Sequence, residues 1–203
     1  MDSRLLDDTV RFMESYNLTN RYDHIALAGA ALGVNTGVTG KSSWGDVFFD
    51  HLAIAVNLLG RKISEVFILE HRNCGAYKKL PEGPGYYKES ECCREKEACD
   101  HAHQAFQLAR EIDAFRQRQI EDAKKAMRAE QAGRIDESES VTKSDCDYPA
   151  EPGPTGAQRM YIWDRMKVCC FLMNLDGTLE HLFEDEWTKK RCKGLNCGRK
   201  HSR

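Results

Sequence analysis

No apolar run in this sequence approaches the roughly 20 residues that a helix needs to cross a bilayer. The first residues, MDSRLLDDTVRF, lack the apolar segment of a secretory signal. The net charge is only -2, so no overall field attracts nucleic acid or an anionic membrane. The sequence also lacks internal repeats. We therefore expect a cytoplasmic protein with neither nucleic acid nor membrane as a partner.

What the sequence does contain is enough chain for one folded domain and an unusual number of cysteines. Its 203 residues suit a single domain with a real hydrophobic core. Nine of them are cysteines. In a reducing compartment we expect these to be thiols, metal ligands or small core side chains rather than a disulfide framework.

Three consecutive segments predict a parallel β-sheet. Residues 22–34, YDHIALAGAALGV, indicate a short buried strand that runs into a turn of small residues. Residues 42–60 have the apolar periodicity of a helix, and residues 64–71, SEVFILEH, form an apolar run of strand length. Strand, helix and strand with short connections predict a βαβ crossover, and hence an α/β fold with a mostly parallel sheet flanked by helices.

The remaining segments complete a single domain over residues 1–203. Residues 2–16 have near-helical apolar spacing, and residues 166–184 predict a strand, a turn at Asp176-Gly177 and a second strand. Between these parts we expect an insertion at about 81–158. It consists of a loop over 81–96, a long helix over 97–131 whose half after about residue 116 is charged and projects, and a polar loop over 136–158, and a basic tail follows at 187–203.

The strand at 64–71 ends in a pair of soft metal ligands, His71 and Cys74. Placed at the carboxyl end of a parallel strand, an imidazole and a thiolate three positions apart can converge on one tetrahedral ion. Gly75 lets the backbone turn away behind them. The alternative is that His71 only ends the strand and Cys74 fills a loop, and the pair alone does not decide between the two.

Two other segments have motif-like patterns. Residues 35–42, NTGVTGKS, nearly match a phosphate-binding loop, but Asn35 replaces the first glycine and the loop does not leave its strand directly, so a flexible turn is the stronger interpretation. The C-terminal group of Cys192, Cys197 and His201 has a spacing wider than a typical zinc knuckle, which favours a basic tail.

The other cysteine and histidine groups are weaker candidates. Cys92 and Cys93, with Cys99, suit either metal or redox chemistry. Cys169 and Cys170 lie in an apolar strand and are expected to pack in the core. His101 and His103 are two positions apart on a helix, point to different faces and make a poor chelating pair.

The start of the chain has an acid–guanidinium pair, Asp2 and Arg4. The two residues can be only a helix start and a solvated charge. Alternatively, the arginine can hold the carboxylate ionised and in one orientation through charge-assisted hydrogen bonds.

Taken together, these residues resemble the β-class carbonic anhydrases. That family has Cys-x-Asp-x-Arg after its first core strand and His-x-x-Cys-Gly after a later one. Here MDSR is followed by HIALAGAALG, by a helix and then by EHRNCGAYK, and VCCFLMNLDGTLEHL is similar to the last strand and turn of the family. The resemblance covers about residues 1–78 and 160–184, whereas residues 81–158 have no counterpart.

The resemblance implies a zinc enzyme. His71 and Cys74 would be zinc ligands, Asp2 would accept a hydrogen bond from the zinc-bound water or occupy the fourth zinc position, and Arg4 would orient Asp2. Zinc lowers the pKa of its water to about 7, and the resulting hydroxide would attack carbon dioxide to give bicarbonate. A homodimer or a higher homo-oligomer is also implied, because these enzymes build their sites near a dimer interface.

The sequence departs from the family at one zinc ligand. The first cysteine of the family pattern would fall just before Met1, and the core strand that carries it is absent. A sheet without that strand has an unpaired apolar slot. We therefore expect an N-terminally shortened version of a longer chain. If it is not shortened, a replacement ligand is needed, either the Met1 amine or a cysteine from the segment 92–99, or zinc binds weakly.

Two other functions fit the same residues. A hydrolase acting on a sulfur analogue of carbon dioxide would use the same site. A catalytically inactive relative would keep the fold for binding or assembly, with the charged helix and loop of 97–158 as its interaction surface.

Overall fold

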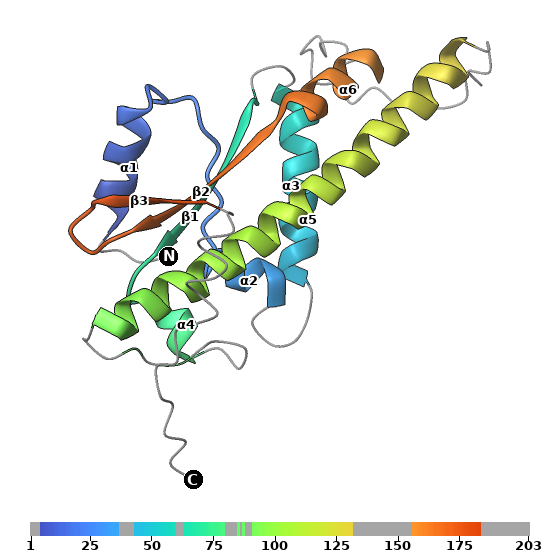
Figure 1. Cartoon of the computed structure of the whole chain (residues 1–203). Helices are drawn as coiled ribbons and strands as arrows, with labels where there is room; N and C mark the ends of the chain where they lie inside the picture. The colour runs from blue at the N-terminus through green and yellow to red at the C-terminus, as the bar shows by residue number, and fades with distance from the viewer. Residues whose placement is uncertain are drawn as a thin grey trace, which may run out of the picture.

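The computed structural model describes residues 5–36, 43–59, 63–79, 85, 87, 91–131 and 156–183. These residues form a mixed α/β fold in which helices surround a small three-stranded sheet (Figure 1). In chain order the elements are α1 (Leu6–Ser15), α2 (Ala31–Thr36), α3 (Ser43–Leu59), β1 (Glu65–His71), α4 (Gly75–Lys79), α5 (Glu91–Gln131), α6 (Gly156–Arg165), β2 (Lys167–Met173) and β3 (Leu179–Leu182).

The sheet is mixed rather than mostly parallel. Its order is β1-β2-β3; β1 pairs in parallel with β2, from Glu65 opposite Lys167 to His71 opposite Met173, and β2 pairs with β3 in antiparallel fashion. The predicted strand, turn and strand of 166–184 are confirmed. The turn between β2 and β3 needs Gly177, whose φ is +81°, a backbone conformation that favours glycine.

Helix α5 crosses the structure and packs against α6, α2 and β2. Its side chains Ala105 and Ile112 are fully buried in a core with Val56 of α3, Ile68 of β1 and Trp163 of α6. The predicted long helix is therefore confirmed, but it begins at Glu91, so the loop expected over 81–96 is wrong for its last part. An acidic residue in a first turn, here Glu91, favours a helix start.

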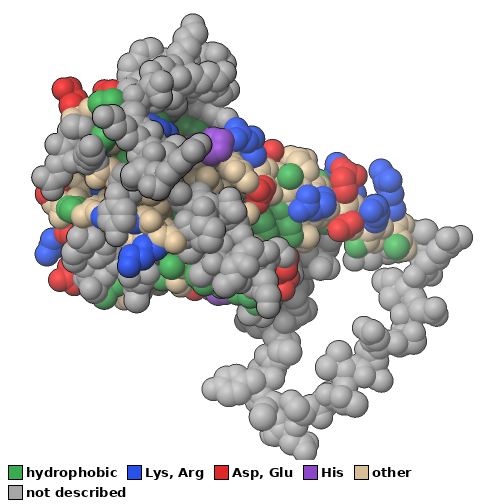
Figure 2. Space-filling view, turned by 90° about the horizontal axis from the view of Figure 1, so that it is seen from below, with side chains coloured by type: hydrophobic (Ala, Val, Ile, Leu, Met, Phe, Trp, Pro, Cys, Tyr) green, Lys and Arg blue, Asp and Glu red, His purple; other side chains and the backbone are tan. Residues whose placement is uncertain are grey.

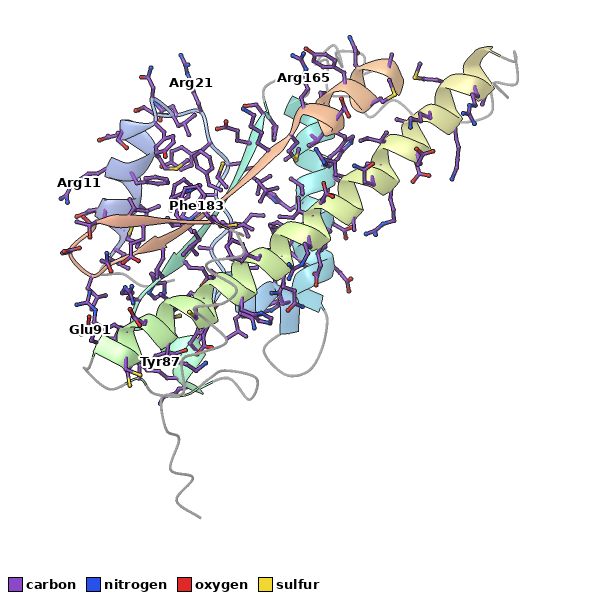
Figure 3. The ribbon with its side chains drawn as sticks, in the orientation of Figure 1. Arg11, Arg21, Tyr87, Glu91, Arg165 and Phe183 are labelled. Carbon is purple, nitrogen blue, oxygen red and sulfur yellow. The ribbon has the colours of Figure 1, made fainter. Side chains whose placement is uncertain are left out.

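The distal half of α5 extends beyond the sheet (Figure 1) and has many charged side chains (Figure 2). Lys124 pairs with Glu121 and Lys125 with Asp122, each three positions apart along the helix. The predicted charged half is thus confirmed, although Ile120 remains buried in the core. Helix α6 begins inside the region expected to be a polar loop and packs against α5. Its last residue, Arg165, is labelled in Figure 3.

The opposite face of the sheet is covered by α1. Phe12 packs its ring edge against Phe171 of β2, with ring centroids 5.1 Å apart, and lies 5.9 Å from Phe67 of β1. Leu5 and Met173 are buried in the same cluster. The helix predicted over 2–16 is therefore confirmed within the described residues, and an aromatic contact holds it on the sheet.

The strand predicted over 22–34 is wrong. Residues 21–27 run without regular secondary structure, and the small residues that follow enter helix α2. Within the described part of the chain, the backbone hydrogen bonds outside helices and strands include none made by residues 22–26. The predicted helix over 42–60 is confirmed as α3, so the expected βαβ unit lacks only its first strand.

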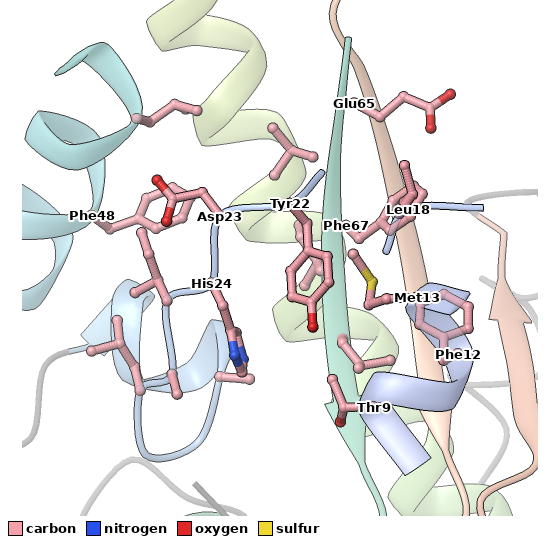
Figure 4. A pocket seen from close by; sticks show the side chains of 18 of the residues that line it. Thr9, Phe12, Met13, Leu18, Tyr22, Asp23, His24, Phe48, Glu65 and Phe67 are labelled. Atoms are coloured by element: carbon pink, nitrogen blue, oxygen red, sulfur yellow. The ribbon is translucent and has the colours of Figure 1, made fainter. Parts of the chain in front are cut away.

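A cavity of about 960 Å³ lies between residues 22–27 and β1 (Figure 4). It is lined by every residue from 20 to 27 on one side and every residue from 63 to 69 on the other. Side chains alternate between the two faces of a strand, so a cavity that touches every consecutive residue lies along the backbone edge. The cavity thus separates the free edge of β1 from the segment that was expected to lie in the same sheet.

Among the helices of the described ranges, none is long and apolar enough to cross a membrane.

Candidate functional site

His71 is the last residue of β1 and is held at the end of the sheet. It stands opposite Met173 in the parallel register, and the backbone N–H of the next residue, Arg72, donates to the Met173 carbonyl over 2.9 Å. The ring nitrogen Nδ1 of His71 lies 3.1 Å from the Arg72 carbonyl oxygen. His71 also lines the cavity beside β1.

Cys74 lies next to His71 and immediately before helix α4. Its side chain is only 4% exposed. Burial opposes ionisation of the thiol, but a hydrogen bond from His71, the charge of His71 and the backbone N–H groups of Tyr77 and Ala76 together hold the Cys74 pKa below its ordinary value. The structure therefore brings the two sequence-predicted ligands together and stabilises the thiolate form that binds metals.

The loop between the two ligands is fixed by Arg72. Its guanidinium donates to Asn174 Oδ1 over 2.6 Å, to the Arg94 carbonyl over 2.8 Å and to Glu180 Oε1 over 3.0 Å. Arg72 is 9% exposed, so these contacts join the strand end, the β2–β3 turn and α5 in a largely buried network. The sequence analysis did not identify Arg72 as part of the site.

Glu97 of α5 holds the next residue of the same loop. Its Oε1 accepts the Asn73 backbone N–H over 2.6 Å, and its Oε2 lies 3.4 Å from Arg72 Nη1. Asn73 has a φ of +57°, the left-handed conformation that asparagine tolerates better than most residues, and its side chain accepts a hydrogen bond from Lys78. The backbone that leads into Cys74 is therefore held from both sides.

A second buried pair lies directly behind the strand end. Glu70 Oε2 is 2.8 Å from His101 Nδ1, and Glu70 Oε1 accepts the Ala31 backbone N–H, also over 2.8 Å. The ring of Tyr77 lies over His101 with centroids 3.9 Å apart. Burial and the nearby Glu70 carboxylate raise the pKa of Tyr77 well above its ordinary value, so its hydroxyl stays protonated.

Sequence features gave only weak signals for these supporting residues. Glu70 is an acid at the end of an apolar run, and Glu97 and His101 are four positions apart on a helix beside its apolar stripe. His101 is buried and His103 exposed, which confirms that the two point to different faces. A buried acid directly before a histidine is the one pattern that pointed toward this cluster.

The other candidate residues do not join this site within the described part of the chain. Asp2, Arg4 and Met1, together with Cys192, Cys197 and His201, lie outside the described residues. Asn35 lies in helix α2, where its side-chain amide donates to the Gln104 carbonyl over 3.0 Å and to Gln104 Oε1 over 2.9 Å, and the rest of the phosphate-loop-like segment lies almost wholly outside the described residues.

The remaining cysteines have mixed outcomes. Cys92 and Cys93 lie on α5 rather than in a loop. Cys99 is disulfide-bonded, which differs from the expected thiols, metal ligands or small core side chains. Cys170 is buried and Cys169 packs partly against the α1 side of the sheet, as expected. Among the residues that the structure describes, no group of three or more histidine, cysteine or acidic side chains is arranged to hold a metal ion.

We expect alkylation of the Cys74 thiol to have an unusual pH dependence. Because His71 and two backbone N–H groups favour the thiolate, Cys74 is expected to react with iodoacetamide at lower pH than an ordinary thiol. Burial and Glu65 raise the pKa of Cys169, so that thiol should need higher pH. Site-resolved mass spectrometry of alkylation against pH measures both in one sample. The interaction between His71 and Cys74 would be contradicted if Cys74 reacted at the same pH as Cys169. It would also be contradicted if the pH profile of Cys74 alkylation were unchanged in His71→Ala.

No protein-family model matches the chain, and no solved structure matches it. It is 38% identical over 81 residues to an uncharacterized protein of Rickettsia bellii, which covers 39% of this chain and 46% of that protein. It is 34% identical over 103 residues to an uncharacterized protein of Rickettsia conorii, which covers 50% of each. The matches thus span about half the length of these curated relatives, and their names describe no activity.

Proposed function

We propose that this chain is a zinc-dependent lyase of the β-class carbonic anhydrase type, which reversibly hydrates carbon dioxide to bicarbonate. The observation that carries the proposal is the pair of His71 and Cys74 at the end of β1, with the thiolate form of Cys74 favoured by its surroundings. The resemblance in motif supplies the reaction.

The chemistry of the two donors fits zinc. Imidazole nitrogen and thiolate sulfur are the ligands that structural and catalytic zinc sites use most. With zinc bound, a neutral His71 would donate from Nδ1 to the Arg72 carbonyl and leave Nε2 for the metal, and the backbone N–H groups at the start of α4 favour the ionised sulfur of Cys74. The described residues supply two donors, so a third protein donor has to come from the remainder of the chain or from a preceding segment.

The cavity beside β1 supports a donor and a substrate approaching from that side. Leu5, the first described residue, lines the same cavity as His71. Leu69 and Met173 add apolar surface near the strand end, which suits a small apolar substrate such as carbon dioxide. The segment that precedes Leu5 contains Asp2 and Arg4, which are our candidates for the acid and for the group that orients it.

In this proposal each side chain has a defined task. Zinc held by His71 and Cys74 would lower the pKa of a water ligand to about 7 and so supply hydroxide at neutral pH. The Asp2 carboxylate would accept a hydrogen bond beside the metal, and the Arg4 guanidinium would keep that carboxylate ionised and oriented. Arg72 and Glu97 hold the loop that separates the two proposed zinc donors: Arg72 donates from this loop to the Arg94 carbonyl of α5, and Glu97 of α5 accepts the Asn73 backbone N–H.

The finer assignments follow from the same resemblance. We propose a β-carbonic-anhydrase-like fold for the domain, a cytoplasmic location and a homodimer or higher homo-oligomer as the working form. A hydrolase of a sulfur analogue of carbon dioxide would use the same donors.

A second candidate function is an inactive relative that serves in binding or assembly. The observation in its favour is the distal part of α5, which extends beyond the sheet and has paired charges such as Lys124 with Glu121 (Figures 1 and 2). Such a charged, extended helix suits an interaction surface as well as a solvated one.

Metal analysis combined with a carbon dioxide hydration assay tests the proposal. Purified protein is measured for zinc by mass spectrometry and for hydration by stopped-flow with a pH indicator. About one zinc per chain together with hydration supports the lyase. Stoichiometric zinc without hydration favours the inactive relative, unless carbonyl sulfide is hydrolysed, which would assign the related hydrolase. Absence of zinc from protein refolded with excess zinc would overturn the proposal.

A further inference from the structure

Glu70 and His101 are the most deeply buried polar pair that the structure describes. Their side chains are 1% and 0% exposed, and the two atoms that face each other, Glu70 Oε2 and His101 Nδ1, are 2.8 Å apart. A buried carboxylate is costly unless it is paired and fully hydrogen-bonded. A polar pair kept at such depth calls for a reason, and the place of Glu70 in the chain, directly before His71, suggests one.

The pair connects four elements around the His71–Cys74 site. Glu70 belongs to β1, and its second oxygen accepts the N–H of Ala31 at the start of α2. His101 belongs to α5, and its ring stacks on Tyr77 of α4, with centroids 3.9 Å apart and planes inclined by 39°. The Glu70 carboxylate therefore fixes the strand end that carries His71 relative to two helices.

Tyr77 connects the pair to the second ligand. The backbone N–H of Tyr77 is one of the two that hydrogen-bond to Cys74. The position of the Tyr77 ring, clamped by His101, thus sets where α4 begins and where its N–H groups point. A chain of contacts therefore leads from Glu70 through His101 and Tyr77 to Cys74. Glu70 is also the residue directly before His71 in the sequence.

One polar atom of this cluster shows that it is not built for stability alone. His101 Nε2 is buried and has no hydrogen-bond partner among the described residues. Such an atom carries a desolvation cost. Apolar side chains of similar volume would fill the space without that cost, so the polar cluster is better explained by the geometry it imposes.

We propose that Glu70 and His101 are positioning residues that set the relative placement of His71 and Cys74, and so the affinity of the site for a metal ion. The inference rests on the proposed function for the identity of the metal. Its structural content, the control of the His71–Cys74 geometry, does not depend on whether the chain hydrates carbon dioxide.

The test compares variants of the buried pair in the full chain. Glu70→Ala removes both acceptors, whereas Glu70→Gln keeps an oxygen for the Ala31 N–H and an amide to face His101. His101→Asn keeps a nitrogen near the Nδ1 position but removes the ring that clamps Tyr77. The matched control is His51→Asn, because His51 makes a 2.9 Å contact with Asp23 on the surface.

Cobalt(II) and zinc serve as probes of the site. The sulfur-to-cobalt absorption band reports ligand geometry, and competition with a chromophoric chelator gives the zinc affinity. We expect Glu70→Ala and His101→Asn to lose 10- to 100-fold in zinc affinity, the range for partners that orient metal ligands, and to shift the cobalt band. Glu70→Gln should recover most of the affinity, and His51→Asn should match the wild type.

Amide hydrogen exchange of the metal-free protein keeps the inference separate from the proposed function. We expect Glu70→Ala and His101→Asn to speed exchange over residues 72–79 more than exchange in β2, which reports the overall loss of stability. If the wild type binds no cobalt, the proposed function fails and the exchange measurement still decides the inference. Exchange over 72–79 that speeds up no more than exchange in β2, in both variants, would overturn it.

Discussion

Under the proposed function, replacing Cys74 by serine is expected to lower the zinc affinity by more than about 100-fold and to abolish hydration of carbon dioxide. The magnitude exceeds the 10- to 100-fold typical of residues that only orient a ligand, because the donor atom itself is lost. A serine hydroxyl is a poor zinc ligand near neutral pH, and its oxygen cannot replace the thiolate that His71 and the α4 backbone stabilise.

Cys169→Ser provides the control for this substitution. Cys169 is also partly buried, but it lies on β2 with a pKa raised by burial and by Glu65, away from any stabilising donor pair. Its replacement should leave zinc affinity within about 2-fold of the wild type, inside the ordinary context dependence of single substitutions. Equal zinc affinity in Cys74→Ser and the wild type, measured by chelator competition, would remove Cys74 from the site.

The parts of the fold that follow from local patterns were predictable. The apolar run before His71, the Asp176-Gly177 turn and the apolar stripe of α5 each encode their own element, so β1, the β2–β3 pair and the long helix were confirmed. His71 and Cys74 were also predicted together, because three positions at a strand end leave little freedom in where the side chains go.

The parts that depend on distant partners were not predictable. Glu70 and His101 are 31 residues apart, and Arg72 and Asn174 are 102 residues apart, so no local sequence pattern predicts either contact. The strand expected over residues 22–34 failed for a related reason. Its composition suits a strand, but a strand needs a neighbour, and a cavity lies along the edge of β1 where one would be required.

His71 of β1 and Cys74, just before α4, are held by contacts with α5, β2 and the β2–β3 turn. His71 also lines the cavity, as does Leu5.

Replacing His101 by alanine is expected to destabilise the protein by about 3–5 kcal/mol, the cost of breaking a buried pair by removing one partner. Glu70, only 1% exposed, would keep the Ala31 N–H but lose the partner that faces its other oxygen. Tyr77 would lose the ring that packs against it. Urea unfolding at pH 7, followed by circular dichroism, measures the loss as a lower midpoint at unchanged slope.

The surface pair of His51 and Asp23 provides the comparison that isolates burial. Its atoms are 2.9 Å apart, close to the 2.8 Å of the buried pair, but the side chains are 42% and 47% exposed. His51→Ala should therefore cost no more than about 1 kcal/mol, since water and salt screen an exposed pair. Both contacts join an imidazole to a carboxylate at nearly the same distance. The difference in destabilisation between His101→Ala and His51→Ala therefore measures the effect of burial. Equal destabilisation by His51→Ala and His101→Ala would show that Glu70 is not held as a buried charge, and would remove the energetic basis for its role behind His71.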